Sequence, residues 1–145
     1  MKIIFVLLFV LCIVSCDSKS SDDNSFGTCD ADGVFTDIQL AENQLLGIWK
    51  WTKSTCGFCS NPGVYEADKE VFASFKSDGS FSVSEDSKTI EEGIWTVRES
   101  ENGSFISVDP KSTLYLGGSI RVCDREFISD SRPWDGPAYL FVKMD

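Results

Sequence analysis

Short apolar or alternating segments separated by turn residues constrain the fold of this chain more than any other feature. Four of them are residues 71–76, 81–84, 93–98 and 105–108. Asp78-Gly79 lies between the first two segments, and Asn102-Gly103 lies between the last two. Glycine accepts positive φ in a tight turn without a Cβ clash, so each pair predicts an antiparallel hairpin.

The segments extend to the end of the chain, and no stretch carries a long amphipathic helical period. The predicted strands are residues 45–53, 71–76, 81–84, 93–98, 105–108, 114–122 (bent at Gly117-Gly118), 126–128 and 138–143. Closure of these strands would remove the exposed edges of an aromatic-rich sheet. We therefore expect an all-β fold, an eight-stranded antiparallel up-and-down barrel, with one or two helical turns over residues 37–46.

The first strand carries Gly47-Ile48-Trp49. Period-two alternation directs Trp49 and Trp51 to one face, where a large indole plugs one end of a small barrel. We expect Gly47 to leave room for the indole of Trp49. The alternative is a glycine and a tryptophan on an ordinary strand.

The N-terminus indicates export. Lys2 precedes an apolar run that is too short to span a bilayer as a helix, which is typical of a signal peptide. Ile13-Val14-Ser15-Cys16 resembles the lipobox of bacterial lipoproteins, which implies that Cys16 becomes the lipidated first residue, carrying acyl chains such as palmitate. An ordinary secretory signal with a chance cysteine is the alternative. The resemblance implies a membrane anchor and an outer-membrane location in the cell envelope.

Three regions follow: the signal peptide (1–15), the lipidated cysteine with a flexible acidic tether (16–35), and the barrel domain (36–145). Ser21-Asp22-Asp23 resembles an acidic motif that exports lipoproteins to the outer surface, although a plain acidic linker fits equally well. The formal net charge of −10 disfavours nucleic acid as a partner, because phosphate contacts need clustered Lys and Arg. Anionic membrane surfaces are disfavoured for the same reason.

Cysteines predict disulfides in the exported domain. Cys29, Cys56, Cys59 and Cys123 are an even set, which favours two bridges with three connectivities open. The Cys56-Gly57-Phe58-Cys59 segment also looks like the motif of thiol oxidoreductases, but it lies in a Gly/Pro/Asn loop. A four-thiolate zinc site is a further alternative on cysteine count.

The chain contains no histidine, which excludes Ser-His-Asp and Cys-His catalysis and imidazole metal sites. Adjacent Glu91 and Glu92 would point to opposite faces of a strand, unlike the paired carboxyls of a glycosidase. Residues 30–33 are only a fragment of a calcium loop. We predict no enzyme, no catalytic residue, no cofactor and no metal.

A family resemblance rests on four motifs: residues 45–49 with Gly47 and Trp49, the Phe-x-x-Asp-Gly turn at 75–79, Gly93-Ile94-Trp95, and Tyr-x-Phe-x-Lys at 139–143. Together they resemble the small lipocalin-like domains of bacterial lipoproteins, over residues 44–145. The resemblance implies an up-and-down barrel with a binding mouth and no catalytic residue.

Residues 54–69 form the longest expected connection after the tether, where such barrels carry the loop that covers the mouth. The candidate residues at the ligand mouth are Phe58, Tyr65, Trp95 and Trp134. Packing of the loop on the rim, and a rigid turn around Trp134, are the alternatives. The leading hypothesis is a membrane-anchored, non-enzymatic protein that binds a small apolar or amphipathic ligand.

Two other functions stay open. A barrel with a filled interior would engage another envelope protein through its loops, as a structural or interaction protein. An exported disulfide oxidoreductase would use Cys56 and Cys59. The presence of an apolar cavity inside the barrel would favour ligand binding, and a filled interior would favour interaction with a protein.

Overall fold

The computed structural model describes residues 26–30, 38–100, 103–111, 114–123 and 125–145, and the expected signal peptide and Cys16 lie outside these ranges. The elements in chain order are η1 (Thr28–Asp30), α1 (Ile38–Leu45), β1 (Gly47–Cys56), β2 (Gly63–Glu66), β3 (Val71–Phe75), β4 (Ser80–Glu85), β5 (Lys88–Ser100), β6 (Gly103–Asp109), β7 (Ser119–Cys123), β8 (Glu126–Asp130), η2 (Arg132–Trp134) and β9 (Ala138–Lys143).

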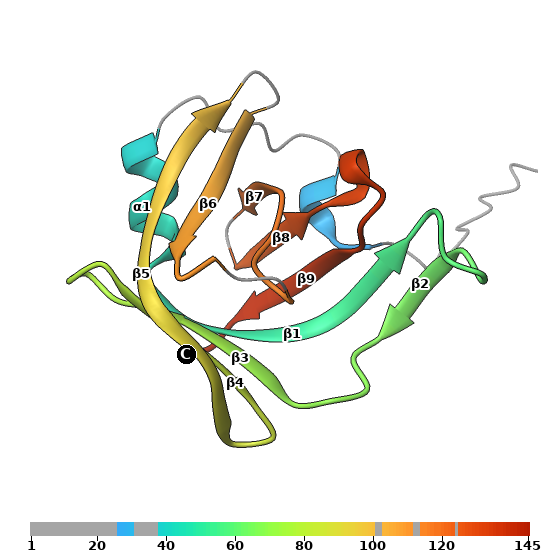
Figure 1. Cartoon of the computed structure of the whole chain (residues 1–145), viewed down its shortest axis with the longest axis horizontal. Helices are drawn as coiled ribbons and strands as arrows, with labels where there is room; N and C mark the ends of the chain where they lie inside the picture. Colours follow the sequence, from blue (N-terminus) through green and yellow to red (C-terminus); the bar gives the residue numbers. More distant parts are fainter. Residues whose placement is uncertain (1–25, 31–37, 101–102, 112–113, 124) are drawn as a thin grey trace, which may run out of the picture.

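Eight strands form a closed antiparallel barrel, as predicted. The order runs from β1 to β3 and then consecutively to β9, and β9 pairs with β1 to close the sheet (Figure 1). We call the end that holds α1, the β3–β4 turn and the start of β1 the helix end. The opposite end, with the β1–β2 turn, the β6–β7 connection and η2, is the hairpin end. The residue pairs between β1 and β3, β1 and β9, and β8 and β9 show which turns lie at which end.

The expected loop over residues 54–69 is partly strand. β1 continues to Cys56, and β2 pairs with its last four residues, so the pair forms a hairpin beside β3 on the same edge of β1. The prediction missed this strand because Gly57, Asn61, Pro62 and Gly63 dominate the segment. The glycines and the proline that indicated a loop belong to the turn and its flanks.

The expected bent strand over residues 114–122 is shorter. β7 begins only at Ser119, because Gly118 has φ of +76° and lies so close to β8 that a Cβ there would overlap the Asp130 carbonyl. Tyr115 and Leu116 instead turn inward and are buried at the hairpin end of the barrel. The connection between β6 and β7 thereby contributes to the core.

Helix α1 confirms the expected helical turns and covers an open edge. β5 is much longer than β4, whose pairing with β5 ends at Ile94. Beyond that point the β5 edge lacks β4, and Glu42 of α1 accepts a hydrogen bond from the backbone N–H of Val97 at 3.4 Å. Ala41 and Leu45 of α1 are fully buried against the barrel. The helix therefore protects a strand edge that would otherwise be exposed.

Aromatic side chains fill the barrel interior. Phe127 on β8 stacks on its register partner Phe141 on β9, with ring centroids 4.5 Å apart. Trp49 meets the same Phe127 ring edge-on at 5.0 Å, and Phe75 meets it at 6.0 Å. None of these four side chains is more than 2% exposed. The interior around β1, β3, β8 and β9 is thus occupied by rings.

A second apolar cluster lies outside the barrel. Ile128, Ala138 and Leu140 point outward from β8 and β9 and are covered by Phe26 and Cys29. We call residues 26–30 the strap. The strap was expected to belong to the flexible tether ahead of residue 36, but it packs on the barrel because an outward apolar patch of β8 and β9 needs cover.

Candidate functional site

The Gly-x-Trp of β1 fixes the helix end of the barrel. Trp49 is fully buried, and its indole N–H donates to the Leu45 carbonyl at the end of α1, at 2.6 Å. Lys143 lies over the Trp49 ring, with its ammonium 5.0 Å from the centroid, and donates to the Gln44 carbonyl. One indole therefore joins the helix, the first strand and the last strand.

Gly47 serves a different purpose from the one expected. Its φ is +124°, and a Cβ there would meet Cε of Lys143 at 3.2 Å rather than the Trp49 indole. Glycine permits the sharp change from α1 into β1 and leaves a path for the Lys143 side chain across the indole. The first and last motifs of the barrel are therefore in direct contact.

The second Gly-x-Trp builds the wall of a cleft. A Cβ at Gly93 would overlap the Asp109 carbonyl, so this glycine permits the close approach of the end of β6. Trp95, two residues later, is 5% exposed and packs edge-on against Phe75 at 5.1 Å. Its indole N–H donates to the Lys76 carbonyl at 3.2 Å.

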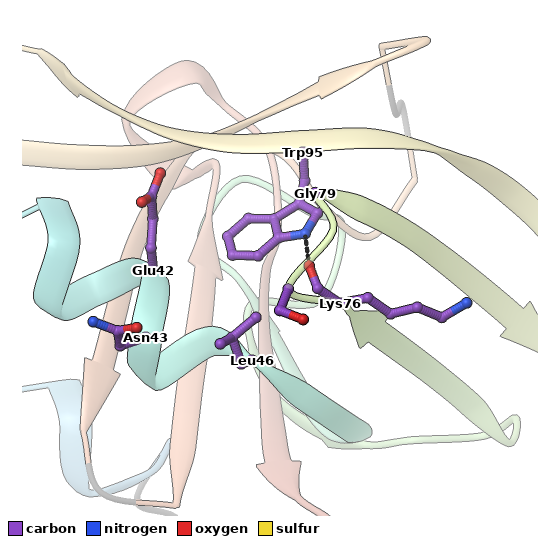
Figure 2. Close-up of a pocket in the computed structure, with 7 residues that line it drawn as sticks. Glu42, Asn43, Leu46, Lys76, Gly79 and Trp95 are labelled. Atoms are coloured by element: carbon purple, nitrogen blue, oxygen red, sulfur yellow. Dashed lines mark hydrogen bonds between the residues drawn. The ribbon is translucent and has the colours of Figure 1, made fainter.

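A cleft of about 260 Å³ opens beside Trp95 at the helix end. Its lining residues are Glu42, Asn43, Leu46, Lys76, Ser77, Gly79 and Trp95. Figure 2 shows the Trp95 indole between α1 and the β3–β4 turn, while the Lys76 side chain points away from Glu42. We call this the helix-end cleft.

The cleft offers binding groups rather than a reactive pair. Glu42 brings a carboxylate that also holds the Val97 N–H, and Asn43 brings an exposed amide. Leu46 and the indole of Trp95 supply apolar surface. A small number of polar groups beside an apolar wall is typical of a binding site.

The hairpin end is closed by a second aromatic group. Trp51, Tyr115 and Tyr139 contact one another, with centroids between 5.2 Å and 5.8 Å apart. The Tyr115 hydroxyl donates to Glu85 at 2.9 Å, and Lys69 donates to the other oxygen of the same carboxylate at 2.7 Å. The rings and this polar bridge cover the interior where the strands end.

Burial and this bridge change the acidity of the groups that form it. Burial, with the hydrogen bond to Glu85 and its negative charge, raises the pKa of Tyr115. Hydrogen bonds from Lys69 and Tyr115 hold the pKa of Glu85 below its usual value. Burial also raises the pKa of Tyr139. Both tyrosines therefore stay protonated well into the alkaline range.

The four expected mouth residues do not line one cavity. Trp95 lines the helix-end cleft, whereas Phe58, Tyr65 and Trp134 lie at the opposite, hairpin end. Phe58 is 76% exposed in the β1–β2 turn, and Trp134 is 56% exposed in η2. Tyr65 is 43% exposed, and its hydroxyl donates to the Asn61 carbonyl. The three hairpin-end aromatics form an exposed rim.

The four cysteines expected to form disulfides are all paired. The sequence left three connectivities open, and the structure shows Cys29–Cys123 and Cys56–Cys59. The first bridge joins the strap to the end of β7. The second closes the β1–β2 hairpin, where Cys56 is the last residue of β1. No helix follows this pair, because β2 comes next. The thiol of an oxidoreductase motif usually has such a helix to lower its pKa.

A charged cluster that the sequence did not predict lies beside the strap. Asp130 is 2% exposed, and Arg132 donates to it from its backbone N–H at 3.0 Å, from Nε at 2.9 Å and from its terminal nitrogen at 2.7 Å. The Arg121 guanidinium lies 3.6 Å from the same carboxylate. An Asp two residues before an Arg was its only local signal, and such pairs are common on surfaces.

Apart from Trp95, the residues of the cleft were not predicted, because no local sequence pattern brings them together. Glu42 and Gly79 are far apart in the chain, and only the closed barrel brings α1 beside the β3–β4 turn. Glu91 and Glu92, which were expected to point to opposite faces of a strand, are neighbours on β5 and both line a shallow surface hollow. Within the described ranges, no cluster of three His, Cys, Asp or Glu side chains is placed to hold a metal ion. The helices described there are too short or too polar to cross a bilayer.

Comparisons with protein-family models, with curated proteins and with solved structures find no match for this chain. The resemblance to lipocalin-like domains therefore stays a prediction from the motifs.

Proposed function

We propose that this chain is an exported, lipid-anchored barrel of the bacterial cell envelope that binds a partner protein through its outer surface and catalyses no reaction. The filled interior carries this proposal. Trp49, Phe75 and Phe127 occupy the space that a lipocalin-like protein would leave for a ligand, and each is at most 2% exposed. Recognition must then use the ends and loops of the barrel.

The helix-end cleft is the part of the surface best suited to that contact. It combines an apolar indole with exposed polar groups from α1 and from the β3–β4 turn. Such a mixture of an aromatic anchor and a polar rim is typical of protein recognition sites. A side chain of a partner would enter beside Trp95 and meet Glu42.

A photocrosslinking experiment tests the contact. The crosslinking residue benzoylphenylalanine replaces Ser77, an exposed cleft residue, or Lys88 in the β4–β5 region as the matched control. In envelopes of the native host, the Ser77 position is expected to give one discrete adduct that the Lys88 position does not give. The same weak smear from both positions would contradict the proposal.

A small ligand at the cleft is the second candidate function. The cleft volume of about 260 Å³ favours it, because it suits a small amphipathic molecule. Titration with a fluorescent fatty acid separates the candidates. Saturable one-to-one binding that is reduced several-fold by Ser77→Arg, which would obstruct the cleft, supports the small ligand. The partner-protein proposal expects no saturable binding of this probe.

The anchor is tested separately by metabolic labelling with an alkyne fatty acid. We expect the full chain to be labelled and to sediment with membranes, because each buried acyl methylene contributes about 0.8 kcal/mol. Cys16→Ala is expected to abolish the label and release the protein. A labelled Cys16→Ala chain, or an unlabelled native one, would contradict the anchor.

A further inference from the structure

Exposed aromatic side chains gather at one end of the barrel. Phe58, Tyr65 and Trp134 are 76%, 43% and 56% exposed, and they come from the β1–β2 turn, β2 and η2. The large apolar side chains exposed elsewhere in the described ranges are aliphatic or methionine. Figure 1 shows the β1–β2 hairpin and η2 toward one side of the barrel and α1 toward the other. We call the three residues the aromatic rim.

The chain enters the folded body at the same end. The Arg132 guanidinium of η2 lies 5.6 Å from the centroid of Phe26, the first described residue of the strap. Further along, Thr28 donates to Glu126 at the start of β8, and Cys29 is bonded to Cys123 at the end of β7. The strap therefore runs from the hairpin end toward the helix end. The chain that leads back to Cys16 begins beside the aromatic rim.

The connecting chain is short. Residues 17–25 separate Cys16 from Phe26, so even a fully extended chain reaches only about 35 Å. A flexible chain of this length has an end-to-end distance of about 17 Å. β1 alone spans about 33 Å from the hairpin end to the helix end. At its average extension, the chain from an anchor at Cys16 thus places the hairpin end nearer to the bilayer than the helix end.

The charges at the hairpin end indicate the kind of membrane surface. Lys69 is bound to Glu85 at 2.7 Å, Arg132 to Asp130 at 2.7 Å, and Lys53 lies 3.8 Å from Glu66. Cations engaged by carboxylates in this way attract anionic lipid weakly. Trp and Tyr rings favour the headgroup region of a bilayer without any net charge.

We propose that the aromatic rim rests in the headgroup region of the bilayer that holds the anchor, on zwitterionic lipid. This inference rests on the lipid anchor of the proposed function. The short tether supplies a high local concentration of bilayer, so a contact of only three side chains is sufficient. The helix-end cleft then faces away from the membrane.

Fluorescence of Trp134 tests the contact directly. The other tryptophans, Trp49, Trp51 and Trp95, are at most 6% exposed, so Trp134 is the one open to quenching by lipid. The full lipidated chain is inserted into phosphatidylcholine vesicles with and without bromine-labelled acyl chains. We expect the Trp134 emission, taken as the difference from Trp134→Phe, to fall about twofold with brominated lipid. Equal emission in both vesicles would overturn the proposal.

Matched variants identify the surface. Phe58→Ser removes one rim side chain, and Ile94→Ser removes a 63% exposed side chain from β5 as the control. Quenching of Trp134 is expected to weaken in the first variant only and to persist at high salt. Equal quenching in both variants would overturn the assignment of the rim.

The mass of the purified mature chain separates this inference from the anchor on which it rests. A chain without acyl groups contradicts the anchor of the proposed function. Unquenched Trp134 in a chain whose mass includes the acyl groups contradicts the membrane contact alone.

Discussion

At the scale of single residues, Asp130 is a buried carboxylate that two arginine side chains contact. Burial alone would raise its pKa, but the hydrogen bonds and charge of Arg132, with the charge of Arg121, outweigh burial and hold the pKa of Asp130 below its usual value. Both arginine side chains are 30% exposed, so water weakens the attraction without removing it. The Asp130 carboxylate thus accepts hydrogen bonds from Arg132 and lies close to the Arg121 guanidinium, beside the strap.

Asp130→Asn is expected to lower the free energy of unfolding by about 1–3 kcal/mol at pH 7, because it removes the buried negative charge that the two guanidinium groups contact. The folded pKa lies below the unfolded one, so the unfolded state binds more protons in acid. The stability from Asp130 is fully present above the pKa of the unfolded state and is lost as pH falls through the lower folded pKa. Urea unfolding at pH 7 and at about pH 3 measures both effects.

Asp135→Asn, at an exposed position of the same turn, is the control and is expected to change stability by less than about 0.5 kcal/mol. A loss for Asp130→Asn that is the same at both pH values would contradict the ionic role of Asp130.

At the scale of elements, the strap and the hairpin carry disulfides of very different reach. Cys29–Cys123 closes a sequence separation of 94 residues, and Cys56–Cys59 closes a separation of 3. A bridge that closes a longer loop restricts the unfolded chain more. The first bridge also holds η1 over the outward face of β8 and β9, where Cys29 is fully buried.

The double variant Cys29→Ser/Cys123→Ser is therefore expected to lose about 4–5 kcal/mol of stability, against about 2 kcal/mol for Cys56→Ser/Cys59→Ser. Each pair is the matched control for the other. Thermal and urea unfolding of the mature domain would measure the difference. Equal losses, or a larger loss at the hairpin, would contradict this ranking.

At the scale of the whole molecule, the barrel behaves as one packed body because strands distant in sequence share the same rings. Phe127 contacts Trp49 of β1, Phe75 of β3 and Phe141 of β9. Phe127→Ala is expected to destabilise the protein by about 3–5 kcal/mol through the cavity it leaves. Phe105→Ala, at a half-buried position of β6, is the control and is expected to cost clearly less.

Unfolding of both variants in urea, followed by tryptophan fluorescence and by circular dichroism, provides the measurement. The transitions measured by fluorescence and by circular dichroism are expected to coincide, because strands β1, β3, β8 and β9 share the same aromatic core. Separate transitions for the two probes would contradict a single cooperative body.

Local patterns predicted the barrel but only part of its surface. Asp78-Gly79 and Trp49 act through neighbours in the chain, so the hairpin and the inward face were readable from sequence. Strand β2 was not predicted, because Pro62 and Gly63 at its start are residues typical of turns and loops. The helix-end cleft depends on contact between α1 and the β3–β4 turn, which no local spacing encodes. Trp95 was singled out, but it lies at the opposite end of the barrel from the other three mouth candidates.

The strap also determines how a pull on the N-terminus would enter the barrel. Cys29 and Cys123 connect the strap to β7 by a covalent route that does not pass through α1. Tension from the N-terminal side would therefore load β7 first, and the cleft beside α1 would be shielded from it. If a protease cut the backbone between Asp30 and Ile38, the Cys29–Cys123 disulfide would still hold the barrel to the N-terminal segment. Release of the barrel would require reduction of this disulfide as well as the cut.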